Sequence, residues 1–375
     1  MKFILTCGGT AGHINPALAV AGRLKELLPG SEFLFIGAEG KMEMQLVPRE
    51  GYEIKALKIT NLRRSFKPQA IAHNLKTVKN VLASLTQARK IIKDFKPDAV
   101  IGTGGYVCFP VLKAASDMHI PTLVHESNAV PGLTTKMLSK YVDRIMLGFE
   151  ESKQYYPQPE KLTVTGTPVR GEFARFTKEA AKRELGIAHN KPLVVSVWGS
   201  LGAGHMNGII SKLIPLMGND CPFSMIHSAG TGYYSKLVAE LDASDPQWRS
   251  RGADVREYIY DMPRVMAAAD LIMCRAGAST ISELSYMGKP VIMVPSPNVT
   301  NNHQEKNARV LEKAGGAKVL LEGEFDAESL YNLIKDTLSD KQGLESMSKA
   351  MASLAVNDAT ERICGIIISL CDNNK

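Results

Sequence analysis

Short runs of apolar and β-branched residues alternate along the first half of the chain with longer amphipathic stretches. The short runs predict buried strands at Lys2–Cys7, Glu32–Ile36, Glu53–Leu57, Asp98–Ile101, Thr122–His125 and Arg144–Leu147. Apolar residues recur at helical spacing between most of them, over Pro16–Leu28, Lys41–Glu50, Gln69–Lys93 and Leu133–Ser139. Strands that alternate with helices in this way predict βαβ units, and therefore a parallel sheet with helices on both faces.

The alternation breaks near residue 166 and then begins again. Prolines and the turn Gly166–Pro168 interrupt it, on either side of a short strand at Thr163–Thr165. Further strands are expected at Leu193–Trp198, Phe223–His227, Val255–Tyr258, Leu271–Cys274, Val291–Val294 and Lys318–Leu321. We therefore predict an α/β protein with two Rossmann-like, doubly wound domains, 1–166 and 167–356, that face a cleft. Residues from about 357 to 375 are predicted to form a helix that packs back on the first domain.

The composition is that of a globular protein long enough for two domains. Of 375 residues, 45% are hydrophobic and 22% are charged, which excludes a disordered chain. No apolar run approaches the roughly 18 to 20 residues that cross a bilayer, and the apolar start Lys2–Cys7 is too short for a signal peptide. Six cysteines without a CxxC pair favour reduced thiols over a disulfide framework or a zinc site. We expect a cytoplasmic protein.

Positive charge is concentrated in one segment of the first half. The whole chain carries +7, whereas the segment 58–96 carries ten basic residues and only one acid, Asp94. This local excess indicates an anionic surface as a partner and argues against a generally basic nucleic-acid coat. The segment also contains an apolar stripe at helical spacing, formed by Ile71, Leu75, Val78, Leu82 and Leu85. The helix either buries this stripe on its own domain or, with Arg63 and Arg64, rests part of it on anionic lipid headgroups.

Glycine-rich loops follow two strands of the first domain. Ligands of open α/β sheets bind beyond the carboxyl ends of the strands, so these loops are the first candidates for a site. Cys7–His13 contains three glycines and leads into a helix, which suits phosphate binding, and His13 ends the loop as a candidate catalytic group. The loop is not a GxGxxG, which weakens a dinucleotide interpretation. Gly102–Tyr106 is a second loop of this kind, so we expect a ligand with more than one phosphate.

Polar residues follow other strands in both domains. His125–Asn128 comes directly after a strand of the first domain, although a hydrogen-bonded turn would have the same sequence. In the second domain Trp198–Gly204 repeats the glycine-rich loop design, and Cys274–Glu283 opens a helix on which Glu283 could accept hydrogen bonds from a ribose. The segment Asn301–Gln304 offers the amide donors and acceptors that recognise sugar hydroxyls.

Taken together and in order, these segments resemble the MurG family, peripheral membrane glycosyltransferases of peptidoglycan synthesis. The resemblance covers essentially the whole chain, at 8–13, 102–106, 125–128, 167–170, 199–203, 274–283, 303–304 and 358–362. The chain departs from the family pattern at Ala11, Ser127, Trp198 and Leu201. Leucine at 201 removes the side-chain hydrogen bond to the donor that glutamine would give.

The resemblance implies a GT-B fold with one substrate on each domain. The donor UDP-N-acetylglucosamine would be held mainly by the second domain. The Ile259 backbone would contact the uracil, Glu283 the ribose and Gln304 the sugar. The phosphates would be bound by Ser200 and by the turn Ala278, Ser279, Thr280, Ile281 and Ser282. Thr10, Ala11, Gly12, Asn128 and Arg170 would complete the donor site. Gly9, Gly104, Gly105 and Tyr106 would hold the pyrophosphate of the acceptor, undecaprenyl-pyrophosphoryl-N-acetylmuramyl-pentapeptide.

The resemblance also implies an inverting transfer to the 4-hydroxyl of the acceptor sugar. Such a transfer needs one base, for which His13 is the first candidate because imidazole titrates near neutral pH. Glu126 is the alternative, either as the base or as the group that orients the imidazole. The chain has no Asp-x-Asp pair, so we expect neither an essential metal nor a cofactor. The enzyme would act as a peripheral protein on the cytoplasmic face of the cell membrane.

Other functions remain open at this point. The chain could be another GT-B glycosyltransferase, for example one that acts on glycolipids, or a UDP-N-acetylglucosamine 2-epimerase. An epimerase would not need the basic amphipathic segment 58–96. A protein of a different class, a non-catalytic sensor of nucleotide sugars, would bind UDP without releasing it from a donor.

Overall fold

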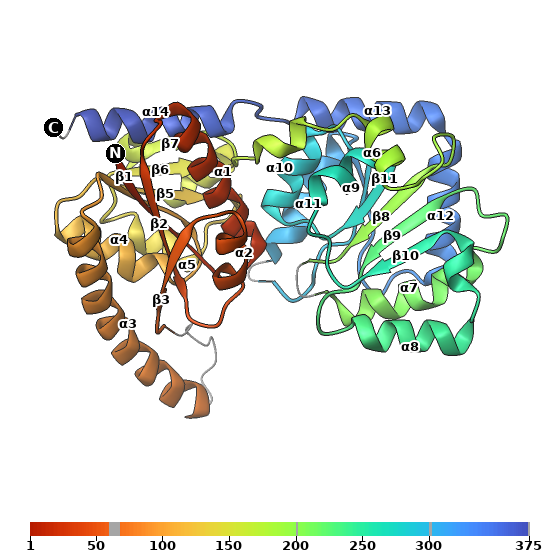
Figure 1. Ribbon diagram of the computed structural model, residues 1–375, viewed down its shortest axis with the longest axis horizontal. Helices are drawn as coiled ribbons and strands as arrows, with labels where there is room; N and C mark the ends of the chain where they lie inside the picture. Colours follow the sequence, from red (N-terminus) through yellow and green to blue (C-terminus); the bar gives the residue numbers. More distant parts are fainter. Residues whose placement is uncertain (60–67, 200–201, 300–301, 374–375) are drawn as a thin grey trace. The chain divides into compact units, whose positions relative to one another are not determined.

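The computed structural model describes residues 1–59, 68–199, 202–299 and 302–373, with the backbone alone for 68–79 and 81–82. The chain forms two units (Figure 1). The first unit consists of Met1–Arg170 and Val356–Lys375, and the second of Gly171–Ala355. Each unit is built on its own parallel sheet.

The sheet of the first unit has seven strands in the order β3-β2-β1-β4-β5-β6-β7. The strands are β1 (Lys2–Cys7), β2 (Glu32–Ala38), β3 (Glu53–Leu57), β4 (Ala99–Gly104), β5 (Thr122–Glu126), β6 (Arg144–Leu147) and β7 (Leu162–Val164). All neighbouring strands are parallel, with Phe3 of β1 opposite both Phe33 and Ala99. The strand order reverses between β1 and β4, which is where doubly wound sheets bind ligands.

Helices cover both faces of this sheet. They are α1 (Ala11–Leu27), α2 (Glu43–Arg49), α3 (Pro68–Phe95), α4 (Cys108–Asp117), α5 (Leu133–Leu138) and α14 (Ala359–Asp372). Successive residues of a strand point to opposite faces, so Phe3 and Leu5 of β1 join the core beneath α1 and α14, whereas Ile4 joins the core beneath α4. In α3, Ala88 and Ile92 are buried in that second core.

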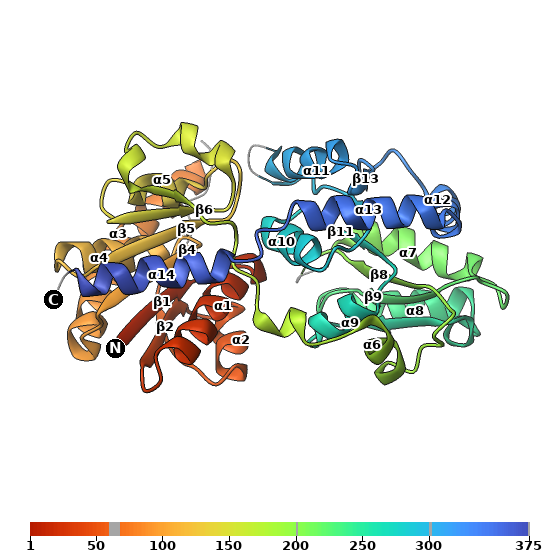
Figure 2. The same cartoon turned by 90° about the horizontal axis from the view of Figure 1, so that it is seen from above.

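The last helix of the chain, α14, completes the core of the first unit. Ile363, Cys364, Ile367 and Cys371 are all buried, in one cluster with Leu24 of α1 and residues of the sheet. Figure 2 shows α14 crossing this unit beside α1. Residues more than three hundred positions apart in the sequence therefore share one hydrophobic core.

The second unit has a six-stranded parallel sheet in the order β10-β9-β8-β11-β12-β13. The strands are β8 (Leu193–Val197), β9 (Ser224–Ser228), β10 (Ala253–Arg256), β11 (Leu271–Cys274), β12 (Val291–Met293) and β13 (Ala317–Val319). The helices are α6 (Lys178–Glu184), α7 (Gly204–Leu216), α8 (Tyr234–Ser244), α9 (Met262–Ala268), α10 (Ala278–Tyr286), α11 (His303–Lys313), α12 (Ala327–Ser339) and α13 (Lys341–Ser353). The order reverses between β8 and β11.

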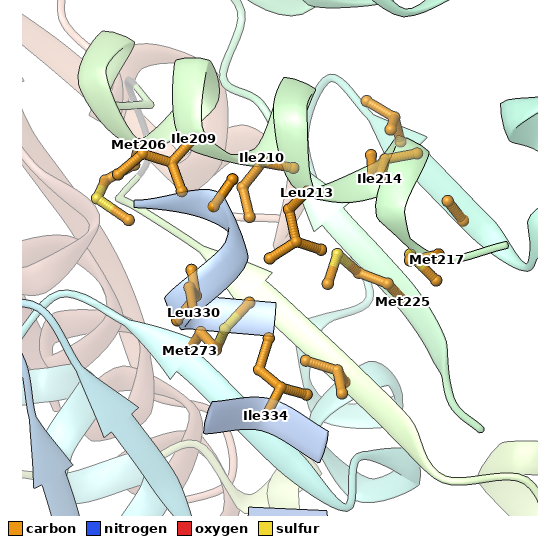
Figure 3. Close-up of a cluster of buried hydrophobic side chains, with 14 of the residues drawn as sticks. Met206, Ile209, Ile210, Leu213, Ile214, Met217, Met225, Met273, Leu330 and Ile334 are labelled. Carbon is orange, nitrogen blue, oxygen red and sulfur yellow. The ribbon is translucent and has the colours of Figure 1, made fainter. Parts of the chain in front are cut away.

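One face of the second sheet is covered by α7 and α12. Figure 3 shows Met206, Ile210 and Leu213 of α7 meeting Leu330 and Ile334 of α12 over the sheet. These five side chains are fully buried. Their spacing of three and four residues puts them on one side of each helix, and this side forms the core.

The predicted fold class is confirmed. Every predicted strand is present, and four of them have the predicted bounds: Lys2–Cys7, Glu53–Leu57, Arg144–Leu147 and Leu271–Cys274. The main difference is the first helix, which was expected to begin at Pro16 but begins at Ala11. Pro16 lies in the second turn, where its missing N–H removes only one bond of the helix. The apolar stripe Ile71–Leu82 predicted on α3 lies outside the described side chains.

Candidate active site

The first glycine-rich loop of unit 1 is shorter than expected. Its N–H groups are used within the protein, since Gly8 donates to the Gly104 carbonyl (3.1 Å) and Gly9 to a Glu43 carboxylate oxygen (3.0 Å). The Gly9 amide, predicted to hold the acceptor pyrophosphate, already donates to a carboxylate within the protein. Thr10 is the N-cap of α1, and the amides of Ala11 and Gly12 in its first turn have no acceptor within the helix. These two amides can bind an anion.

His13 lies in the first turn of α1 and not in the loop, because its N–H donates to the Thr10 carbonyl (3.0 Å). Its ring lies against Gly104, the last residue of β4, where an added Cβ would overlap the imidazole. Thr103 fixes the backbone from the other side by donating to the His13 carbonyl (2.6 Å). The histidine is thus held between the carboxyl ends of β1 and β4.

The second loop is packed on the first. Gly104 and Gly105 both have positive φ, +122° and +93°, and a Cβ on Gly105 would collide with the Gly8 carbonyl oxygen. Tyr106, half-buried, follows directly, and burial together with the charge of Glu43 raises the pKa of its hydroxyl. Of the predicted acceptor residues, Gly104 therefore lies against His13, and Gly105 and Tyr106 follow it directly in the chain.

The end of β5 carries two buried titratable residues with different partners. His125 donates from Nε2 to the Gly166 carbonyl (2.9 Å) and accepts from the Ser127 hydroxyl (3.2 Å), and burial lowers its pKa. The carboxylate of Glu126 accepts hydrogen bonds from the Asn128 backbone and side chain (both 3.0 Å) and from the Gly132 amide (3.0 Å). Glu126 therefore shapes the loop 126–132, and the Asn128 side chain, predicted to contact the donor, uses one of its two N–H donors there.

Arg170 is the last residue of the N-terminal stretch of the first unit. Its guanidinium donates to Glu50, at the end of α2, over 3.2 Å, and the arginine side chain is only 15% exposed. A donor contact from Arg170 requires that this ion pair be shared or broken.

The predicted phosphate turn of unit 2 forms the start of α10. Gly277 is the N-cap, so the first-turn amides from Ala278 onward have no acceptor within the helix. Ala278, Ser279 and Ile281 are buried, Thr280 is partly exposed, and the Ser282 hydroxyl donates back to the Ala278 carbonyl (3.2 Å). Backbone amides rather than the Ser282 hydroxyl are therefore the donors available to a phosphate.

The other predicted donor residues of unit 2 lie on neighbouring loops. Glu283 of α10 is 7% exposed. Burial, and to a smaller extent the charge of Glu283, raises the pKa of the Cys274 thiol to about 12. Ile259 is buried in the loop after β10. Gln304, in the first turn of α11, accepts from the Ser296 amide (2.9 Å) and keeps its N–H₂ group as a donor. Ser200 and Leu201 lie outside the described residues.

Two charged residues that bond to these loops, Glu43 and Arg275, have no role in the sequence-based interpretation. Glu43 holds the first loop of unit 1, as described above. Arg275 follows β11 and donates to the Val294 and Pro295 carbonyls (3.1 and 3.2 Å), and it pairs with Glu322 over 2.6 Å. A charged residue directly after a buried strand is a signal that could have identified Arg275. No comparable local signal exists for Glu43.

No group of three or more metal-ligating side chains occurs within residues 1–59, 68–199, 202–299 and 302–373. Among the helices that the structure describes, none combines the length and apolar character needed to span a bilayer.

Both halves of the chain match known domains. Residues 3–147 match the glycosyltransferase family 28 N-terminal domain, and residues 193–363 match the corresponding C-terminal domain. A curated protein of Acetivibrio thermocellus, named UDP-N-acetylglucosamine–N-acetylmuramyl-(pentapeptide) pyrophosphoryl-undecaprenol N-acetylglucosamine transferase, is 46% identical over 373 residues, or 100% of this chain and 99% of that protein. A protein of the same name from Caldanaerobacter subterraneus is 41% identical and covers 98% of this chain and 99% of its own length.

Solved structures of related proteins have a similar fold over nearly the whole chain. The crystal structure of MurG from Acinetobacter baumannii is similar with a TM-score of 0.69 at 27% identity, over 98% of this chain and 99% of that one. A UDP-GlcNAc 2-epimerase from Neisseria meningitidis reaches 0.66 at 17% identity, over 98% of this chain and 100% of that one. The epimerase likeness concerns the fold alone, so the fold does not separate transfer from epimerisation.

Proposed function

Because the chain belongs to glycosyltransferase family 28, we propose that it transfers N-acetylglucosamine from UDP-N-acetylglucosamine to lipid-linked N-acetylmuramyl-pentapeptide. The sugar goes to the 4-hydroxyl of the acceptor and forms the β-1,4-linked disaccharide precursor of peptidoglycan. The observation that carries this proposal is the similarity to transferases of that name over the full length of the chain, at 46% identity.

His13 serves as the base in this proposal. The acceptor O4 attacks C1 of N-acetylglucosamine, the bond between C1 and the phosphate oxygen breaks, and UDP leaves with the electron pair. The proton of the acceptor hydroxyl goes to the imidazole. Two observations support His13 over Glu126: its ring lies at the junction of the two glycine loops, whereas three N–H groups already occupy the Glu126 carboxylate. Glu126 then contributes by shaping the loop after β5.

The second unit binds the donor. The first-turn amides of α10 neutralise charge that develops on the leaving diphosphate, because a helix N-terminus carries partial positive charge. Glu283, on the same helix, accepts from the ribose hydroxyls, and the Ile259 backbone meets uracil. Gln304 donates to the sugar through the amide nitrogen that Ser296 leaves available.

The first unit binds the acceptor pyrophosphate. The amides of Ala11 and Gly12 are directed away from the helix body and have no acceptor within it, which supports this role. Tyr106, which follows Gly105 in the chain, is the further acceptor residue of this proposal. Thr10, Ala11, Gly12, Asn128 and Arg170 complete the donor site, as the family resemblance implies.

The direct test is transfer of radiolabelled sugar from UDP-N-acetylglucosamine to a lipid-linked muramyl-peptide. A disaccharide product that requires the acceptor supports the proposal. A UDP-sugar isomer formed without acceptor would instead indicate an epimerase, and bound UDP without product would indicate a nucleotide-sugar sensor.

The acceptor lipid requires the enzyme to work at a membrane surface, which we propose to be the cytoplasmic face. The support is the excess of basic residues at 58–96, of which Lys58, Lys90 and Lys93 are exposed in the described part. Each basic residue near an anionic surface contributes about 1 kcal/mol, and the contribution decays over roughly 8 to 10 Å. Three or four such contacts hold the protein at the surface.

Charge reversal tests this association. We expect replacement of Arg63, Arg64 and Lys67 by Glu to abolish binding to vesicles that contain anionic lipid and to raise the KM for the lipid acceptor. The KM for UDP-N-acetylglucosamine should not change. Wild-type binding that ignores lipid charge and salt would contradict the electrostatic part of the proposal.

A further inference from the structure

A fully buried carboxylate lies under the first glycine loop. Glu43 is the first residue of α2 and is 0% exposed. One of its oxygens accepts from the Gly9 amide (3.0 Å), and the other accepts from the Ala38 amide at the end of β2 (2.9 Å). Among the described residues the structure gives it no ion pair. Burial of a carboxylate without an ion pair is unfavourable unless hydrogen bonds stabilise it. The Gly9 and Ala38 amides therefore stabilise the buried Glu43 side chain, and its carboxylate in turn fixes the orientation of both amides.

Two glycines leave the space that this side chain fills. A Cβ added to Gly8 would lie 2.6 Å from Oε1 of Glu43, and a Cβ added to Gly37 would lie 2.5 Å from its Cγ. Neither glycine has the positive φ that would explain it by backbone conformation. The slot between β1 and β2 is therefore shaped for the glutamate side chain.

The loop that Glu43 holds is joined to the catalytic histidine. The Gly8 amide donates to the Gly104 carbonyl, and the ring of His13 lies against Gly104. The peptide unit that joins Gly8 to Gly9 has its N–H on Glu43, so its carbonyl is directed to the opposite side, where Gly105 packs against it. The orientation of one peptide unit therefore sets how both loops meet.

We propose that Glu43 is a positioning residue for sugar transfer, whose carboxylate fixes the peptide unit between Gly8 and Gly9 and thereby the placement of His13 and of the α1 amides. This inference rests on the proposed function. Glu43 does not touch the substrates, since it is buried beneath the loop. Its negative charge also lies close to the N-terminus of α1, where the helix dipole stabilises an anion.

The first test is Glu43→Gln, which keeps the shape of the side chain. A glutamine oxygen can accept from one of the two amides, but its N–H₂ group then faces the other amide, donor against donor. We expect kcat with the lipid acceptor to fall about 10- to 100-fold, because a misplaced base and misplaced amides weaken transition-state contacts. The dissociation constant for UDP should stay within about twofold, because UDP binds to the second unit.

Asp98→Asn is the matched control. The Asp98 carboxylate accepts a hydrogen bond from the Lys2 amide (2.7 Å), so it also links β1 to β4. This link lies at the amino ends of the two strands, away from the glycine loops. We expect this variant to lose some thermal stability and to keep kcat. An equal loss of kcat in both variants would show that Glu43 acts only through stability and would overturn the inference.

Gly37→Ala provides a second perturbation that keeps the charge. The added methyl displaces the Glu43 side chain, so we expect the same loss of kcat with UDP affinity unchanged. Hydrogen exchange of the Gly9 amide gives a readout that does not depend on activity: the amide should be protected in the wild type and exchange faster in both variants. Normal kcat or unchanged Gly9 protection would overturn the positioning role. A wild-type enzyme without transferase activity would instead contradict the proposed function.

Discussion

A buried histidine in the second unit makes the stability of that unit depend on pH. His227 on β9 is fully buried, and its Nε2 donates to the Asn207 side-chain oxygen (3.0 Å), whose amide nitrogen donates to the Ala229 carbonyl (2.9 Å). Its Nδ1 accepts from the Ser196 hydroxyl (3.0 Å). This network holds the neutral ring, and burial lowers the pKa of His227 from 6.5 to about 3.

The sign and size of the effect follow from proton linkage. Between pH 6.5 and pH 3 the unfolded chain binds a proton at residue 227 that the folded unit excludes, so stability falls as the pH falls. Above about pH 7 the contribution of His227 to the free energy of unfolding has its full value. Lowering the pH from 7 to 5 should remove about 2 kcal/mol from the free energy of unfolding, since each pH unit below 6.5 is worth about 1.4 kcal/mol.

The assay uses the two tryptophans, Trp198 and Trp248, which are both buried in the core of the second unit. Denaturant unfolding followed by their fluorescence should show that His227→Gln removes about 2 kcal/mol of the difference between pH 7 and pH 5. His189→Gln, at an exposed position of the same unit, is the matched control and should leave the pH dependence unchanged. A His227→Gln variant with the full wild-type pH dependence would refute the reasoning.

Three substitutions test the site and the core. His13→Ala should lower kcat by about 10² to 10⁴, as expected for a general base, with UDP affinity unchanged in calorimetry; a normal kcat would assign the base to Glu126 or solvent. Glu283→Ala should weaken UDP-N-acetylglucosamine binding by about 1.5 to 3 kcal/mol, because a charged acceptor of ribose hydrogen bonds is lost, and unchanged affinity would contradict donor binding by the second unit. Ile367→Ala should destabilise the first unit by about 2 to 5 kcal/mol in thermal unfolding, and Ile366→Ala, at a partly exposed position, by clearly less. Equal effects of the two isoleucine changes would contradict the packing of α14.

The strands were predictable because their signal is local. In β1, for example, Phe3, Ile4 and Leu5 form a short apolar run, which is typical of a buried parallel strand. The glycine loops were recognisable for a similar reason, since positive φ at Gly104 and Gly105 requires glycine at those positions. Their bonding was not predictable, because the Gly8 amide meets a carbonyl 96 residues away.

The start of α1 and the role of Glu43 show where local signals fail. Proline is favoured in the first turn of a helix, so Pro16 predicted a helix start that the structure places five residues earlier. The wrong boundary placed Gly12 and His13 in a loop. Glu43 resembles any acidic residue in the first turn of a surface helix, and only the glycines at 8 and 37, far from each other in sequence, give it a buried slot.

The return of α14 to the first unit has a consequence for biosynthesis. Residues of Gly171–Ala355 emerge from the ribosome before Ile363 and Ile367, which complete the core of the first unit. At about 5 to 20 residues per second, the intervening stretch takes roughly 10 to 40 s to translate. During that interval the apolar surface of α1 that α14 later covers is exposed, so nascent chains should be most susceptible to protease and most strongly bound by chaperones until the last helix is released.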